Sequence, residues 1–205
     1  VGQQPGRRIA LTFDDGPSPL WTPEILAYLH SHHLPATFFT IGSQATQYRG
    51  LIHQEAREGF EIGNHTLTHT ALSNGPMWSR KLQLDMTESI LVGLTGHYHR
   101  LLRPPYSATP GAVTPNDARN LAKLTNDRYI VVLTNYDSED WQRPGVARIV
   151  RNATPAQGRG GIIMFHDGGG NRSQTLAALK VLVPELRAQG YRFVNVSALL
   201  DASKI

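Results

Sequence analysis

The chain of 205 residues is long enough for one sizeable domain that folds without disulfides or a structural metal ion. Its net charge of +4 is scattered along the sequence without a run of like charges, which argues against a nucleic-acid partner. It has no cysteine, which excludes thiolate metal sites and cysteine nucleophiles, and no apolar run approaches the length of a membrane span.

Short apolar segments alternate with helical patterns along the chain. Several apolar segments lack a strict alternation of polar residues, as expected of strands covered on both faces. Within 78–94, Leu82, Met86 and Ile90 repeat every four residues and are expected to line one face of a helix. In chain order we expect strand 9–13, a helix capped by Thr22 with Pro23 at its first position, strand 36–41, helix 47–58, strand 60–63, helix 78–94, strand 101–103, a helix opened by Thr114-Pro115, strand 129–134, a short helix around 146–150, strand 161–166, helix 173–189 and strand 191–196.

Seven strands that alternate with six helices predict a parallel α/β architecture. We expect residues 1–205 to form a single domain, built as a barrel or partial barrel, with a doubly wound open sheet as the alternative. The start at Val1 instead of Met indicates a processed protein or a domain of a larger one. In both architectures the chemistry gathers at the C-terminal ends of the strands, so the polar residues found there are the candidate site.

Two of these strand ends carry residues typical of metal sites. Asp14 and Asp15 follow the first strand, and they fit either a simple turn before Gly16 or a pair that divides the work of base and metal ligand. His65 and His69 follow the third strand at a spacing that places both imidazoles on one helical face, although this spacing also arises by chance. Two histidines and one aspartate would leave a position open for water, as catalytic zinc sites do.

Three further strand ends carry polar clusters. Arg103 and Tyr106 flank two prolines after the fourth strand, which also fits a rigid loop. Asp140 and Trp141 follow the fifth strand, in a segment that suits either a polar cleft with an aromatic wall or an acidic turn. His166 ends the sixth strand and titrates near neutrality, as a general acid should, although a lone histidine is more often structural.

Together these clusters form five motifs in a fixed order. They resemble the motifs of carbohydrate esterase family 4, the NodB-homology polysaccharide deacetylases, and the resemblance covers residues 8–200. It implies a distorted, incomplete (β/α) barrel of about seven parallel strands. The motifs are Thr-Phe-Asp-Asp-Gly at 12–16, His-Thr-Leu-Thr-His at 65–69, Arg-Pro-Pro-Tyr at 103–106, Asp-Ser-Glu-Asp-Trp at 137–141 and Met-Phe-His at 164–166.

The resemblance implies a metal centre and a catalytic base. Asp15, His65 and His69 correspond to the metal ligands of the family. They imply one divalent ion, with Zn²⁺ as the first expectation and Co²⁺ or Ni²⁺ as alternatives. Asp14 corresponds to the general base, and Arg103 to the residue that orients Asp14 and sets its charge.

The resemblance also implies the residues around the substrate. The backbone amide of Tyr106 corresponds to an oxyanion donor, Trp141 to one wall of the sugar groove, and His166 to the general acid. Asp140 corresponds to a residue that tunes the network joining His166 to the arginine beside the base. Met164 stands where the family usually has the leucine that lines the acetyl-methyl pocket, so we expect a pocket of altered shape.

The implied activity is a metal-dependent N-deacetylase. It would release acetate from β-1,4-linked N-acetylglucosamine polymers or oligomers, such as chitin oligosaccharides or peptidoglycan, by attack of a metal-activated water. The alternatives are an O-acetyl esterase on acetylxylan, a hydrolase of other amides, and a glycan-binding module without catalysis. The resemblance further implies that the protein is a monomer and that it acts at the cell envelope of a bacterium or outside the cell. Domains of this family are also often fused to membrane glycosyltransferases, and such a fusion is expected to be possible here.

Overall fold

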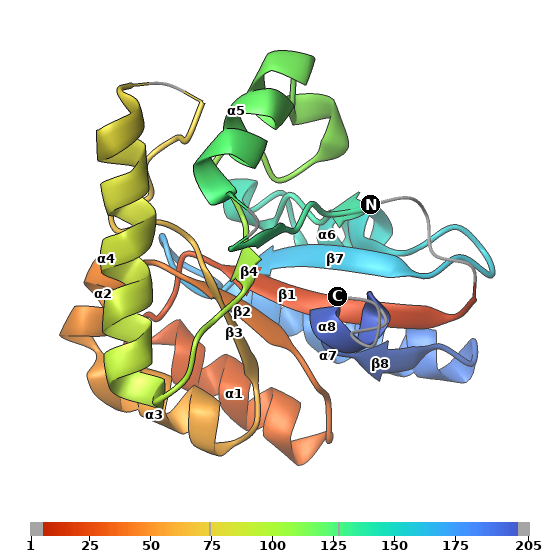
Figure 1. Ribbon diagram of the computed structural model, residues 1–205. Coiled ribbons are helices and arrows are strands. Elements are labelled where there is room, and N and C mark those ends of the chain that lie inside the picture. The colour runs from red at the N-terminus through yellow and green to blue at the C-terminus, as the bar shows by residue number, and fades with distance from the viewer. Residues whose placement is uncertain (1–5, 74, 127, 201–205) are drawn as a thin grey trace.

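The fold is built on one curled parallel sheet with helices around it (Figure 1). The computed structural model describes residues 6–73, 75–126 and 128–200 of the chain. Within them the sheet has eight strands in the order β5-β4-β3-β2-β1-β7-β6, and β8 pairs with β1. The strands are β1 (Arg8–Asp14), β2 (Thr37–Thr40), β3 (Glu61–Asn64), β4 (Leu101–Leu102), β5 (Ile130–Val131), β6 (Tyr136–Asp137), β7 (Gly161–His166) and β8 (Arg192–Val194).

The chain itself joins the two edges of this sheet. Strands β5 and β6 lie at opposite ends of the strand order, yet only residues 132–135 separate them. The Val132 amide donates to the Leu102 carbonyl on β4 at 2.8 Å, and the Asn135 amide donates to the Ile162 carbonyl on β7 at 2.9 Å. This crossing curls the sheet into the incomplete barrel that the family resemblance implies, and the open doubly wound sheet is excluded.

One predicted strand is wrong in extent. In place of the strand expected at 129–134, the structure has the short β5 and then β6, which the sequence pattern missed. Each of these strands has only two residues, too few for a periodic pattern to indicate. Between them the side chain of Thr134 donates to the Ile162 carbonyl at 2.9 Å, so polar side chains replace part of the ladder.

The helices cover the outer face of the sheet, apart from the short helix at 196–199, whose Val196 and Leu199 pack with Ala10 of β1 on the inner side. The expected helix at 47–58 is in fact two, α2 and α3, separated at Tyr48. Every helix among the described residues is too short or too polar to cross a membrane. The helices are α1 (Trp21–Ser31), α2 (Gly42–Gln47), α3 (Arg49–Arg57), α4 (Met77–Thr95), α5 (Pro115–Thr125), α6 (Val146–Ala153), α7 (Ser173–Ala188) and α8 (Val196–Leu199), with short 3₁₀ helices η1 (Pro110–Ala112) and η2 (Asp140–Gln142).

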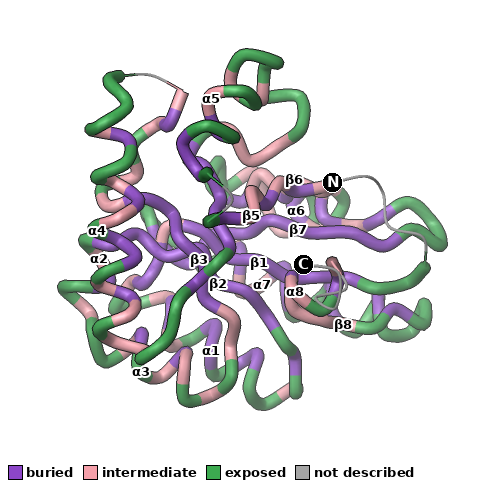
Figure 2. The backbone as a smooth tube through the Cα atoms, in the orientation of Figure 1, coloured by how far each residue is buried: buried purple, intermediate pink, exposed green. Residues whose placement is uncertain are grey.

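Strand β1 divides the core into two sides. Ile9, Leu11 and Phe13 pack with apolar side chains of α1, α6 and α7 in the largest buried cluster. The alternate residues Thr12 and Asp14 point to the inside of the curled sheet. Figure 2 shows strands β1, β2 and β7 as the buried centre and the outer surfaces of the helices as exposed. Because side chains alternate along β1, Thr12 and Asp14 at its end provide polar groups to the inside of the sheet.

Helix α1 begins two residues earlier than predicted. Thr22 is not the cap, because the helix starts at Trp21 and no side chain caps it. Instead, the Thr22 hydroxyl accepts a hydrogen bond from the Ser18 amide at 2.7 Å and donates to the buried carboxyl of Asp167. The polar residue that resembled a cap thus ties the start of α1 to the loop after β7.

Helix α4 packs with a different face from the one its apolar repeat indicates. Leu82 and Met86 are 50% and 44% exposed, and Ile90 is half-buried. The packed face instead carries Leu84 together with polar residues such as Glu88, whose carboxylate accepts a hydrogen bond inside the protein. The apolar repeat indicated the wrong face because part of the buried face consists of hydrogen-bonded polar residues, which an apolar pattern does not detect.

Substitution of Phe13 is expected to be the most costly single truncation in the core. Phe13 is fully buried, with its ring centroid 5.1 Å from that of Phe38 and 5.9 Å from that of Phe165. We expect Phe13→Ala to lower the free energy of unfolding by about 3–5 kcal/mol, measured by urea denaturation. The matched variant Tyr98→Ala, at a side chain 79% exposed, should stay within about 0.5 kcal/mol of the wild type.

Candidate active site

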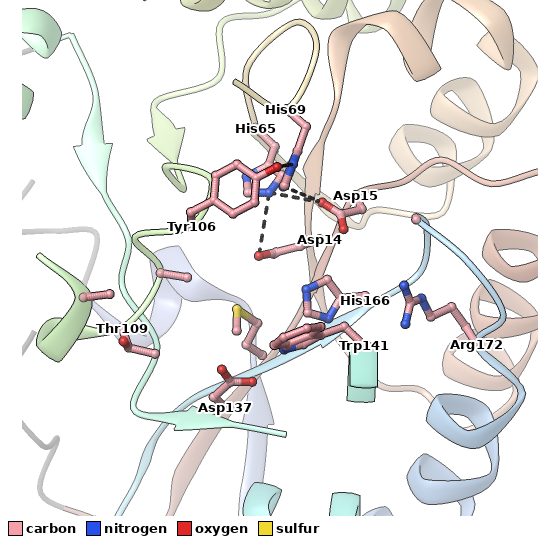
Figure 3. A pocket seen from close by; sticks show the side chains of 14 residues that line it. Asp14, Asp15, His65, His69, Tyr106, Thr109, Asp137, Trp141, His166 and Arg172 are labelled. Carbon is pink, nitrogen blue, oxygen red and sulfur yellow. Dashed lines mark hydrogen bonds and ion pairs between the residues drawn. The ribbon is translucent and has the colours of Figure 1, made fainter. Parts of the chain in front are cut away.

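A cavity of about 470 Å³ lies at the C-terminal ends of the strands (Figure 3). Because β1 and β7 pair in the register Asp14 with His166, these two residues lie side by side at its floor. Arg103 and Asp140 do not line the cavity but contact residues that do. The other site residues predicted from the sequence all line it: Asp14, Asp15, His65, His69, Tyr106, Trp141, Met164 and His166.

Three of these residues form a group suited to a metal ion. The ligand atoms of Asp15, His65 and His69 all lie within 4.8 Å of one another. Asp15 Oδ1 is 3.3 Å from Nε2 of His65 and 3.1 Å from Nε2 of His69. This oxygen is buried and has no hydrogen-bond partner among the described residues, so the group fits a cation placed between the three atoms.

The two histidines are held by their other ring nitrogens. Nδ1 of His65 donates to the carbonyl oxygen of Arg103 at 2.7 Å, and Nε2 on the other side of the ring is directed at Asp15. Nδ1 of His69 lies 3.1 Å from the hydroxyl of Tyr106. Such partners fix the orientation of a metal-binding imidazole. The contact with Tyr106 is new, because the sequence assigned only its backbone amide.

The segment from His65 to His69 is not a helix, which corrects the basis of the spacing argument. Thr66 and His69 adopt φ angles of +67° and +56°, in the left-handed region, and the segment is a loop. The histidines converge because the loop turns back on itself, not because they share a helical face. Asp15 and Tyr106 also have positive φ angles, of +73° and +62°. Backbone strain of this kind collects at functional sites.

The electrostatic setting of Asp15 matches a ligand role. Burial alone would raise the pKa of Asp15, but its contacts with His65 and His69 outweigh burial and hold the pKa well below the usual range. The loop after β7 packs against the backbone of Asp15. A Cβ at Gly168 would lie 2.1 Å from the Asp15 carbonyl oxygen, so only glycine fits there.

Asp14 is held by a fully buried arginine. Nη1 of Arg103 donates to Asp14 Oδ1 at 2.7 Å and to the Thr12 hydroxyl at 2.7 Å. The guanidinium stacks over the Phe39 ring, 4.2 Å from its centroid. The other oxygen, Asp14 Oδ2, is free to face the cavity, 4.0 Å from Nε2 of His65. One residue thus serves both sides of the site, because the Arg103 carbonyl also orients His65.

His166 is paired with Asp140, which resolves the network left open by the sequence. Nδ1 of His166 lies 2.6 Å from Asp140 Oδ1, and its amide donates to Asp140 Oδ2 at 3.0 Å. Thr175 donates a further hydrogen bond to the same carboxylate at 2.6 Å. Burial favours the neutral imidazole, but the negative charge of Asp140 outweighs burial and raises the pKa of His166 to about 9. His166 is therefore protonated at neutral pH.

This pair predicts a shift in the pH profile. The charges that face His166 are those of Asp140, Asp14, Asp15 and Asp137. His166 loses the proton that it would donate as the pH rises through its raised pKa. The kcat/KM of the wild type should therefore fall near pH 9. We expect Asp140→Asn to move this alkaline limb toward neutrality by about one pH unit or more. An alkaline limb that stayed in place would contradict the pairing.

Aromatic residues form the walls of the cavity. The Tyr106 side chain is 72% exposed and that of Trp141 54% exposed, whereas Met164 is almost fully buried at the floor. The Tyr106 amide donates to no group among the described residues, which leaves it available for a ligand. Exposed rings flanking a polar floor suit the flat faces of a sugar.

The sequence missed three residues around this floor. Thr175 on α7 holds Asp140, and Asp167 is a fully buried carboxyl whose pKa burial raises to about 7. Arg172 lines the cavity and is 4% exposed. The sequence feature that could have pointed to these residues is the run of glycines at 168–170, shortly after β7, because it indicates a loop that approaches another backbone closely. No motif marked the residues that follow this run.

Comparisons with known proteins agree with this geometry. Residues 1–129 match the family model for polysaccharide deacetylase. A peptidoglycan-N-acetylglucosamine deacetylase of Bacillus cereus is 39% identical over 193 residues, which cover 94% of this chain and 87% of that protein. A chitooligosaccharide deacetylase of Bradyrhizobium sp. is 36% identical over 90% of this chain and 87% of its own length. The crystal structure of the Bc1960 peptidoglycan N-acetylglucosamine deacetylase has a TM-score of 0.84 at 32% identity, over 96% of this chain and 90% of that chain.

A partial α/β barrel that holds an Asp-His-His group beside a carboxylate and a histidine defines a hydrolytic enzyme of the metal-dependent class. The chain belongs to the polysaccharide deacetylase family. The resemblance to carbohydrate esterase family 4, the fold that it implied and the enzyme class are therefore confirmed.

Proposed function

We propose that this deacetylase removes N-acetyl groups from β-1,4-linked N-acetylglucosamine units of peptidoglycan or chitin-type oligosaccharides. The observation that carries the proposal is the placement of Asp14 and His166 side by side next to the group Asp15, His65 and His69. Relatives named for peptidoglycan and for chitooligosaccharides both support this substrate class. We propose that the enzyme acts on such glycans at a bacterial cell envelope or outside the cell, which the peptidoglycan deacetylase relatives support.

We propose one divalent ion, zinc, at the group of three ligands. One carboxylate and two imidazoles are a donor set typical of catalytic zinc, and they leave a coordination position open. The bound ion supplies polarisation of the acetyl carbonyl and lowers the pKa of water, from ~15.7 toward ~7 in favourable sites. Cobalt and nickel suit the same donors and are the alternatives to test.

In the proposed reaction two side chains, those of Asp14 and His166, each transfer one proton. Asp14 takes a proton from the attacking water at Oδ2, while Arg103 holds Oδ1. The Tyr106 amide donates a hydrogen bond to the acetyl oxygen as negative charge develops there. His166, held protonated by Asp140, gives its proton to the sugar nitrogen as the carbon–nitrogen bond breaks and acetate leaves.

The same cavity suggests how substrate is placed. Trp141 and Tyr106 would stack against the sugar ring, and Met164 would contact the acetyl methyl group at the floor. We further propose that residues 1–205 form one catalytic domain, because a single sheet runs through the described residues, and that this domain acts as a monomer. Light scattering coupled to size exclusion measures that state directly.

Metal removal and substrate comparison test the proposal. The protein is stripped with a chelator, zinc is added back, and acetate release is followed from chitopentaose, peptide-free peptidoglycan strands and acetylated xylan in parallel. We expect release from the N-acetylated glycans to return with zinc. Faster release from xylan would establish an O-acetyl esterase instead. No release from any substrate, with metal bound, would favour a glycan-binding module.

A further inference from the structure

Arg172 is a buried cation that forms no ion pair among the described residues. It is 4% exposed, and no carboxylate oxygen among the described residues lies within 4.0 Å of its guanidinium. Nε donates to the Gly168 carbonyl at 2.7 Å, but Nη1 has no hydrogen-bond partner among the described residues. A buried charge that lacks a partner is costly, by several kcal/mol, so its retention calls for an anionic partner supplied from elsewhere.

The guanidinium borders the cavity and is left uncovered by glycine. Arg172 lines the cavity, and Figure 3 shows it beyond His166 and Trp141, on the side away from Thr109. A Cβ at Gly169 or Gly170 would lie 3.4 Å from Nη2, so a side chain at either position would cover this nitrogen. The two glycines, themselves exposed, therefore leave an opening toward the guanidinium.

A neutral sugar hydroxyl would recover little of the cost of burying Arg172. A carboxylate accepts a charge-assisted hydrogen bond from the guanidinium, here through Nη2, and compensates its charge. Among the glycans of the proposed function, chitin-type chains are neutral. In peptide-free peptidoglycan strands, every second sugar, N-acetylmuramic acid, carries a free carboxylate on its lactyl ether; where a stem peptide is attached, this carboxyl is an uncharged amide. The position of Arg172 beside the reacting groups suits a substituent on the sugar next to the one that is deacetylated.

We propose that Arg172 is a specificity residue that binds the free lactyl carboxylate of the neighbouring sugar and so favours peptide-free peptidoglycan strands over neutral glycans. This inference rests on the proposed deacetylase function. It assigns to Arg172 a contact with substrate and no part in the transfer of protons.

The test compares three tetrasaccharides with the wild type and with Arg172→Gln. They are chitotetraose, the peptide-free tetrasaccharide that alternates N-acetylglucosamine with N-acetylmuramic acid, and the same compound with its lactyl carboxyls converted to methylamides. We expect the variant to lose about 10- to 100-fold in kcat/KM on the carboxylate form, mainly through KM, and less than about 3-fold on the other two. The ratio between substrates does not depend on how much of the variant is folded.

Two further variants sharpen the result. Arg172→Lys keeps the charge but loses the planar donor pair, so it should retain part of the preference. Arg192→Gln removes an exposed arginine from β8, which pairs with the other end of β1, and should match the wild type on all three compounds. Equal losses of Arg172→Gln on the three compounds, or no preference in the wild type, would overturn this inference alone. No acetate from any compound would overturn the proposed function and this inference with it.

Discussion

The Asp14→Asn variant is expected to bind metal as the wild type does and to lose about 10²- to 10⁴-fold in kcat, the range typical of a removed general base. Asn presents an oxygen to Arg103 in the position of Oδ1, so the hydrogen bond of 2.7 Å has a substitute. It cannot take a proton from water. Acetate release gives kcat, and a metal titration on the same sample gives the affinity and stoichiometry.

A surface pair provides the matched control for this substitution. Asp85 and Arg128 form an exposed ion pair at 2.9 Å, chemically the same as the buried pair of Asp14 and Arg103. Asp85→Asn should leave kcat within about 2-fold, because exposed pairs contribute at most ~1 kcal/mol and this one is remote from the cavity. If Asp14→Asn kept a rate near that of Asp85→Asn, the base assignment would be wrong.

Much of the site could be predicted because its residues directly follow strands. Parallel strands bring their C-terminal ends to one edge, so Asp14, His65 and His166 had to meet once the strands were placed. The polar residues that support them were different. Thr175 lies within a helix and Arg172 just before it, and no local pattern distinguishes either from a surface residue.

The elements that were wrong share a physical cause. The face with which α4 packs and the short strands β5 and β6 depend on tertiary contacts, such as the buried Glu88 and the bond of Thr134 to β7. The sequence shows these polar groups but does not indicate which residues they bond to. The partner of Glu88 lies 11 residues away in the chain and that of Thr134 lies 28 residues away. The prediction that His65 and His69 lie close together was correct, but the helical geometry behind it was wrong. A loop with left-handed residues brings the two imidazoles together instead.

The His65→Ala variant is expected to differ in kind from Asp14→Asn, because it removes a ligand and not a base. It deletes Nε2, one of the three atoms that lie within 4.8 Å of one another, and leaves the Arg103 carbonyl without its donor. Loss of a group that only orients a ligand costs about 10- to 100-fold in metal affinity, so we expect at least about 100-fold here. Metal titration measures this without any substrate.

Activity should follow occupancy in this variant. At a metal concentration that saturates the wild type, acetate release by His65→Ala should be undetectable, and excess zinc should restore at most a small fraction. His53→Ala is the matched control, since His53 is an exposed histidine on α3, outside the residues that line the cavity. It should bind one ion with wild-type affinity. Unchanged affinity in His65→Ala would place the ion elsewhere, whereas lost affinity with intact Asp14→Asn binding separates the ligand from the base.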